Sequence, residues 1–220
     1  MRESKRTCHV WKGSSCAVIV AHPDDETLWV GGTILMHPEA KWTIITLCRK
    51  EDKDRAPRFY RAIRELDATG IMGDLDDSPE QEPLDSNRVQ NKILTLLPSD
   101  SFDLIITHSC KGEYTKHLRH EETARAVLNL WKMGKIWTTE LWSFAYEDNE
   151  GKCLPQPIQD AHLHIELSQE IWQKKKNIIT EIYGFGEDSF EAMTTPKQEA
   201  FWCFDWPIKQ QRSVERSEMK

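Results

Sequence analysis

The alternation of short apolar runs with amphipathic stretches most constrains how this chain can fold. Four runs rich in β-branched or aromatic residues predict buried strands over 17–21, 42–48, 103–108 and 140–146. Helical spacing predicts helices over 25–36, 57–69, 87–97 and 120–133. This order is typical of βαβ units. It predicts a three-layer, Rossmann-like α/β fold, in which helices flank a mainly parallel sheet and the site lies at the carboxyl ends of the strands.

The length of the chain favours a single domain over residues 1–220, because 220 residues lie close to the usual domain size. We expect an ordered core over about 14–208 and a charged tail over 210–220 that frays. An extended segment at 162–166 precedes a predicted helix over 168–182, which Ser168 caps.

Charge and hydropathy exclude several classes of partner. The formal net charge of −7 argues against a nucleic-acid or anionic-membrane surface, which needs clustered Lys and Arg. The longest apolar run, 16–21, is too short for an integral membrane segment, and 1–13 is too polar for a signal peptide. We therefore expect a cytoplasmic protein of unspecified oligomeric state. The six cysteines form no CxxC pair and are expected to be reduced thiols, with Cys48 and Cys110 buried rather than catalytic.

One imidazole and three carboxylates follow the first predicted strand, in the order His22, Asp24, Asp25 and Glu26. Charged groups at the end of a buried strand need a partner, and a divalent cation can supply it. The alternative is an ordinary acidic first turn, in which the carboxylates stabilise the positive end of the next helix. Both interpretations are compatible with this cluster taken alone.

A second polar cluster favours the interpretation as a metal site over that as an ordinary acidic first turn. His117 and His120 follow the strand predicted at 103–108 and lie three residues apart at the start of a helix. Either histidine can join His22 and Asp25 at the same edge of the sheet. Three such ligands with an open fourth position are typical of catalytic zinc.

These motifs resemble those of the LmbE-like, or PIG-L, superfamily of zinc-dependent deacetylases that act on N-acetylglucosamine-containing substrates. The resemblance rests on Ala-His-Pro-Asp-Asp-Glu at 21–26, Gly-Gly-Thr at 31–33 and His-x-x-His at 117–120. It extends over about 17–183 and is looser beyond residue 133.

Carried over to this chain, the resemblance implies that His22, Asp25 and His120 hold Zn²⁺, although another divalent transition metal is possible. Asp24 is then the general base that takes a proton from the zinc-bound water. His117, in a protonated form, stabilises the oxyanion. The implied substrate is an N-acetylglucosamine-type sugar or another small N-acylated glycoconjugate.

The chain departs from the family pattern at three places. Many members carry Pro and Asp between the two histidines, where this chain has Leu118 and Arg119. A neighbouring cation tends to lower the pKa of His117, unless Glu113 or Glu121 compensates. Tyr114 lies one residue further from His117 than the family tyrosine does. Arg58 fits the start of the family's Arg-x-x-Glu helix, but Arg61 replaces the Glu. Arg58 and Tyr114 are the candidate substrate-binding residues.

The remaining polar candidates have weaker patterns. His108 ends a strand at the correct edge, and either orients a ligand or is a satisfied core histidine. His162 and His164 share one face of a strand and favour a structural role. The acidic run at 73–79 lacks the calcium-loop pattern and is interpreted as a solvated loop over the site.

The leading functional hypothesis is therefore a zinc-dependent N-deacetylase. A first alternative is another divalent-metal hydrolase, such as a phosphoesterase, which needs a mostly oxygen ligand set. A second is a catalytically silent ligand-binding protein. Retention of Asp24 argues against the second, because a binding protein needs no base.

Overall fold

A computed structural model describes residues 12–80, 82–115 and 117–205. The tail predicted at 210–220 lies outside these residues, as does Cys8. Nine strands are assigned in the described chain: β1 (Ser15–Val20), β2 (Lys41–Cys48), β3 (Thr69–Leu75), β4 (Ser101–Thr107), β5 (Trp137–Phe144), β6 (Tyr146–Glu147), β7 (Gln156–Pro157), β8 (Leu163–Glu166) and β9 (Gln198–Asp205). The helices are α1 (Asp25–Met36), α2 (Arg55–Glu65), α3 (Ser86–Leu96), α4 (Leu118–Lys132), α5 (Gln169–Asn177), the π-helical segment η1 (Ile178–Ile182) and α6 (Phe190–Thr194).

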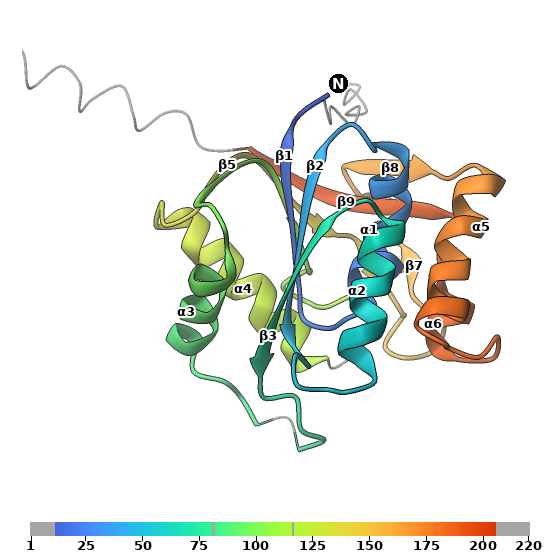
Figure 1. Ribbon diagram of the computed structural model, residues 1–220, viewed down its shortest axis with the longest axis horizontal. Helices are drawn as coiled ribbons and strands as arrows, with labels where there is room; N and C mark the ends of the chain where they lie inside the picture. The colour runs from blue at the N-terminus through green and yellow to red at the C-terminus, as the bar shows by residue number, and fades with distance from the viewer. Residues whose placement is uncertain (1–11, 81, 116, 206–220) are drawn as a thin grey trace, which may run out of the picture.

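The seven-stranded central sheet has the order β3-β2-β1-β4-β5-β9-β8. Strands β1 to β5 run parallel, whereas β9 is antiparallel to both β5 and β8. Helices α3 and α4 lie on one side of the sheet, and α1, α2, α5 and α6 lie on the other (Figure 1). The predicted three-layer α/β fold with a mainly parallel sheet is confirmed.

Each face of the sheet has its own apolar core. Trp29 and Phe59 belong to the core on the α1 side, and Val89 and Leu130 to the core on the α4 side. The central strands are buried on both faces, which explains why they appear in the sequence as continuous apolar runs.

Strand β3 was not predicted: the sequence suggested a helix up to residue 69 and a loop from 73. Gly70 and Gly73 interrupt its apolar pattern, and packing explains both. A Cβ on Gly70 would lie 2.8 Å from Phe59, and one on Gly73 would lie 2.7 Å from the carbonyl oxygen of Leu47. Glycine here permits close packing rather than ending an element.

The C-terminal part of the fold also differs from expectation. The helix predicted over 168–182 changes from α5 to the π-helical η1 at Ile178, and α6 and β9 were not predicted. Strand β9 contains Glu199, whose carboxylate is fully buried and accepts a hydrogen bond from Lys175 Nζ at 2.7 Å. The Gly32 and Thr33 amides donate to the same carboxylate, so this ion pair joins α1, α5 and β9.

Two further expectations concern thiols and membranes. The five cysteines in the described part of the chain are free thiols. Burial raises the pKa of the Cys48 thiol, which argues against nucleophilic use. Among the described residues, no helix combines the length and apolar character that crossing a membrane requires.

Candidate metal centre

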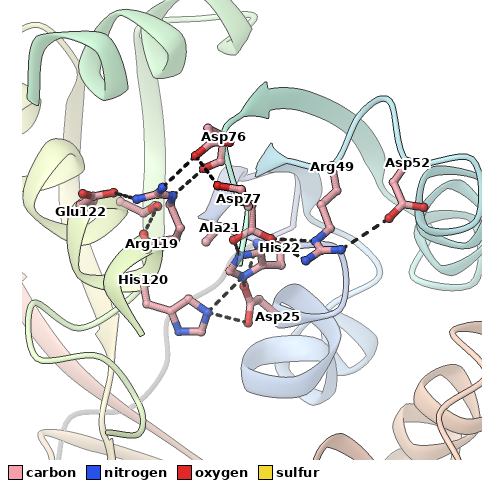
Figure 2. A network of polar contacts seen from close by, with 12 residues as sticks. Ala21, His22, Asp25, Arg49, Asp52, Asp76, Asp77, Arg119, His120 and Glu122 are labelled. Carbon is pink, nitrogen blue, oxygen red and sulfur yellow. Dashed lines mark hydrogen bonds and ion pairs between the residues drawn. The ribbon is translucent and has the colours of Figure 1, made fainter. Parts of the chain in front are cut away.

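The candidate site lies at the carboxyl edge of the parallel strands. His22 follows β1, Asp77 follows β3 and His108 follows β4, while Asp25 and His120 lie in the first turns of α1 and α4. Figure 2 shows His22, Asp25 and His120 pointing toward one another from separate elements. The sheet topology therefore brings together the two polar clusters found in the sequence.

Donor atoms of three residues converge at nearly equal distances. His22 Nδ1 lies 3.3 Å from Asp25 Oδ2 and 3.3 Å from His120 Nε2, and His120 Nε2 lies 3.3 Å from Asp25 Oδ1. Ligands of a tetrahedral zinc ion with bonds of about 2.0 Å are about 3.3 Å apart. Two imidazole nitrogens and one carboxylate oxygen also match the donor types that zinc prefers. The residues therefore fit a metal ion of this kind.

Other nearby groups offer alternative donors. Nitrogens of His22, His117 and His120 lie within 4.8 Å of one another, and so do donor atoms of Asp25, His108 and His120. His108 is already engaged, because its Nε2 accepts the Ala21 amide at 3.0 Å. The ring of His117 is therefore the further nitrogen donor next to His22, Asp25 and His120.

Two carboxylates outside this donor set contact the other ring nitrogens of the histidines. Glu113 Oε2 lies 2.7 Å from His120 Nδ1 and 2.9 Å from His108 Nδ1, and Asp77 Oδ1 lies 3.1 Å from His22 Nε2. If these nitrogens carry the protons, His120 Nε2 and His22 Nδ1 face each other as lone pairs. Burial alone would raise the pKa of Glu113, but the charge and hydrogen bonds of His108 and His120 lower it to about 2.

Asp24 lies beside the converging donors and has a strained backbone, with φ at +120°. The Glu26 carboxylate accepts the Asp24 amide at 3.0 Å, and Tyr183 Oη donates to Glu26 at 2.7 Å. Burial, followed by the charge of Asp25, raises the pKa of Asp24, while Arg55 opposes the shift by donating to Asp24 Oδ2 at 2.8 Å. A carboxylate with a raised pKa is suited to proton transfer near neutral pH.

The protonated form of His117 stays a prediction. Burial, followed by the neighbouring His120 and His22, lowers the pKa of His117 to about 3, which favours a neutral imidazole. Its Nδ1 is buried and has no hydrogen-bond partner within the described chain. Glu113 does not compensate His117, because it binds His108 and His120 instead. Arg119 points away from the site and is not adjacent to this ring.

A cavity of about 170 Å³ opens beside these groups. Its lining residues are His22, Pro23, Asp24, Asp25, Leu28, Arg49, Arg55, Asp77, Tyr114, His117, Phe190 and Glu191. Tyr114 lies in the lining, as expected of a substrate contact. Arg58 does not: its guanidinium donates to Asp54 Oδ1 at 2.9 Å and to the Tyr183 carbonyl oxygen. Arg55, one helical turn earlier in α2, lines the cavity instead.

Sequence reasoning missed several residues of this lining. The acidic run after β3 was interpreted as solvated, but the Asp77 side chain is only 6% exposed and binds His22. Phe190 and Glu191 come from the unpredicted α6. His162 and His164 have structural partners, since each ring hydrogen-bonds a main-chain carbonyl, of Cys203 and Ile158 respectively.

The fold and these contacts define an α/β protein with a candidate metal centre at the carboxyl edge of its sheet. The family model of the GlcNAc-PI de-N-acetylases (PIG-L) matches residues 17–131, and the chain belongs to this family.

Two solved structures and one curated protein are similar to this chain. A deacetylase triple mutant of the teicoplanin biosynthetic pathway has 16% identity and a TM-score of 0.65, with 88% of this chain and 99% of that chain covered. GalB, the 4-carboxy-2-hydroxymuconate hydratase from Pseudomonas putida, has 16% identity and a TM-score of 0.56, with 86% and 95% covered. The uncharacterized protein L374 of Acanthamoeba polyphaga mimivirus is 21% identical over 184 residues, 77% of this chain and 76% of that protein. At these identities, the two structural similarities show a shared fold.

Proposed function

We propose that this protein is a zinc-dependent N-deacetylase that removes an acetyl group from an N-acetylglucosamine-type sugar or glycoconjugate. The observation that carries the proposal is the convergence of His22 Nδ1, His120 Nε2 and the Asp25 carboxylate beside Asp24: the two nitrogens lie 3.3 Å apart, and each lies 3.3 Å from one oxygen of Asp25. Another divalent transition metal can use the same donors.

In this proposal His22, Asp25 and His120 hold the ion. When bound, such an ion polarises an acyl carbonyl and lowers the pKa of water. The Glu113 and Asp77 carboxylates accept hydrogen bonds from His120 and His22 and orient the two imidazoles, so the metal-binding atoms are already arranged in the protein without the ion.

Asp24 performs the proton transfers. Its carboxylate takes a proton from the attacking water as the new C–O bond forms at the acyl carbon, and then gives that proton to the amine nitrogen as the C–N bond breaks. The products are acetate and a free amine. Arg55 orients the Asp24 carboxylate through Oδ2.

His117 and Tyr114 are placed to stabilise negative charge on the acyl oxygen. Both line the cavity beside the donor set, and each can donate an N–H or O–H. Burial raises the pKa of the Tyr114 hydroxyl, which keeps it protonated as a donor. We assign no direct substrate contact to Arg58, because its guanidinium is bound to Asp54 and Tyr183.

The family supports the acyl-sugar substrate. The matching family is that of the GlcNAc-PI de-N-acetylases, and one similar structure is a deacetylase of teicoplanin biosynthesis. The cavity combines the ring of Phe190 with the charged groups of Arg49, Arg55 and Glu191, a combination that suits the apolar face and the hydroxyls of a sugar. The imidazole donors argue against a phosphoesterase that uses magnesium.

The test is acetate release by the zinc-loaded protein from a panel of N-acetylglucosamine glycosides. Asp24→Asn should lower the rate by about 10²- to 10⁴-fold, the usual contribution of a positioned base, and should retain zinc. Asp54→Asn is the matched control, because this exposed carboxylate lies outside the cavity, and it should release acetate at the wild-type rate. Wild-type activity in Asp24→Asn would show that Asp24 is not the general base. Cleavage of phosphate esters instead of amides by the wild type would favour the phosphoesterase.

A further inference from the structure

Arg119 lies between the two histidines of the His-x-x-His motif but does not face the site. Its side chain is only 2% exposed and extends toward the segment that follows β3 (Figure 2). Nε donates to the Asp76 carbonyl oxygen at 2.6 Å, and Nη2 donates to the Glu82 carbonyl oxygen at 3.0 Å. Nη1 donates to Glu122 Oε2 at 2.7 Å, so the guanidinium binds two main-chain carbonyls and a carboxylate at once.

This set of contacts depends on the geometry of arginine. The guanidinium presents five N–H donors in a rigid plane, whereas lysine concentrates three donors on one atom. The contacts with the two main-chain carbonyls therefore depend on an arginine at position 119.

The residue next to Asp76 contacts a proposed metal ligand. Asp77 Oδ1 lies 3.1 Å from His22 Nε2, and Arg49 binds the other oxygen of the same carboxylate. Asp77 thus holds the His22 ring with Nδ1 facing Asp25 and His120. A shift of the main chain at Asp76 would move this carboxylate away from His22.

We infer that Arg119 is a positioning residue for the metal centre: by holding the main chain at Asp76, it places Asp77 against His22 and so directs His22 Nδ1 to the ion. Arg119 touches neither the proposed ligands nor the cavity, and acts only through Asp77. The inference rests on the proposed function to the extent that the centre binds zinc.

A purely structural role for Arg119 makes a different prediction. Loss of a buried arginine lowers stability in either case, because Glu122 Oε2 loses its cationic partner. If Arg119 is a positioning residue, its loss should also change the tautomer of His22 and the zinc affinity, and both effects should depend on Asp77.

The experiment measures the zinc dissociation constant by competition with a chelator for wild type, Arg119→Met, Asp77→Asn and the double variant. Each single variant should bind zinc about 10- to 100-fold more weakly, as is usual when a group that orients a ligand is removed. The double variant should bind no more weakly than Asp77→Asn alone. Arg125→Met is the control on the same helix, since this exposed arginine forms an ion pair with Glu121, away from Asp77, and it should match wild type.

A second readout follows the His22 ring directly. In the zinc-free protein, ¹⁵N NMR should show a protonated Nε2 in wild type and a mixture of tautomers in Arg119→Met. If Arg119→Met does not fold, Arg119→Lys replaces it, because lysine keeps the charge but cannot reach both carbonyls, and it should show the same weakening and tautomer mixture.

Zinc affinity and a His22 tautomer unchanged from wild type in the folded Arg119 variant would overturn the inference. Additive losses in the double variant would also overturn it, because they would show that Arg119 does not act through Asp77. If wild type itself binds no zinc, the proposed function fails first, and the tautomer measurement still decides whether Arg119 positions His22.

Discussion

Helix α1 carries two buried clusters of charge that differ in how their groups are satisfied. Two turns into the helix, the Glu199 carboxylate accepts from the Gly32 and Thr33 amides, the Thr33 hydroxyl and Lys175 Nζ, and both charged side chains are fully buried. We call this the closed cluster. In its first turn, Asp25 faces His22 and His120, where imidazole nitrogens approach each other to 3.3 Å. We call this the open cluster.

The difference shows two uses of buried charge. In the closed cluster every contact joins a donor to an acceptor within the protein, so the cluster stabilises the fold and needs no ligand. In the open cluster two imidazole nitrogens face each other at 3.3 Å, and Asp24 beside them is held at a strained φ. A divalent cation can satisfy such a cluster, as the proposed function requires.

The largest effect should come from breaking the closed cluster. Lys175→Met leaves Glu199 buried without its cation and should lower the free energy of unfolding by about 3–5 kcal/mol, measured by urea denaturation of the metal-free protein. The folded variant should bind zinc as wild type does. Lys174→Met is the control, because this neighbouring lysine is exposed and forms a surface ion pair with Glu170. A loss below about 1 kcal/mol would show that the pair contributes little.

Zinc binding should distinguish the two clusters, because it should stabilise the folded protein only when the open cluster is intact. A ligand that binds only the folded state at 100 times its dissociation constant adds about 2.7 kcal/mol to the free energy of unfolding. We expect this increment in wild type and in Lys175→Met, and none in His120→Ala, when each is titrated with zinc during thermal unfolding. An increment that survives in His120→Ala would place the zinc elsewhere.

The smallest effect should come from Asp52, at the exposed edge of the open cluster. Its Oδ1 accepts the Asp54 and Arg55 amides at 2.9 Å, so Asp52→Ala should cost about 1 kcal/mol, as loss of a helix cap does.

The effect of Asp52→Ala should also depend on pH. The Arg55 amide hydrogen bond, against some opposing burial, lowers the pKa of Asp52 in the folded state. Its contribution is therefore full above the unfolded pKa of about 3.9 and is lost as pH falls through the lower folded value. Urea denaturation at pH 7 and at successively lower pH measures this. A difference between wild type and variant that grows as pH falls would contradict the assignment.

The predictable parts of the molecule are those whose structure follows from a local pattern of residues in the sequence. The strands β1, β2, β4 and β5 are buried on both faces and appear as apolar runs. His22, Asp25 and His120 follow such strands or begin the next helix, so the parallel topology alone predicts that they meet. Their roles as ligands remain a proposal that the zinc experiments address.

The parts that were missed depend on contacts that no local pattern records. Strand β9 carries a buried Glu199, whose charge is satisfied only by residues distant in the chain. Asp77 was assigned to a solvated loop because its neighbours are acidic, and its burial depends on His22 and Arg49. Arg119 was expected to act on His117 through sequence proximity, yet the helix turns its side chain to the opposite side.

The central claim is that His22, Asp25 and His120 hold the metal while Asp24 remains free for catalysis. Elemental analysis of purified wild type, Asp24→Ala and His120→Ala tests it most directly. We predict about one zinc per chain in wild type and in Asp24→Ala, and little in His120→Ala. A wild type without transition metal, or a His120→Ala variant that retains its full zinc content, would contradict the account.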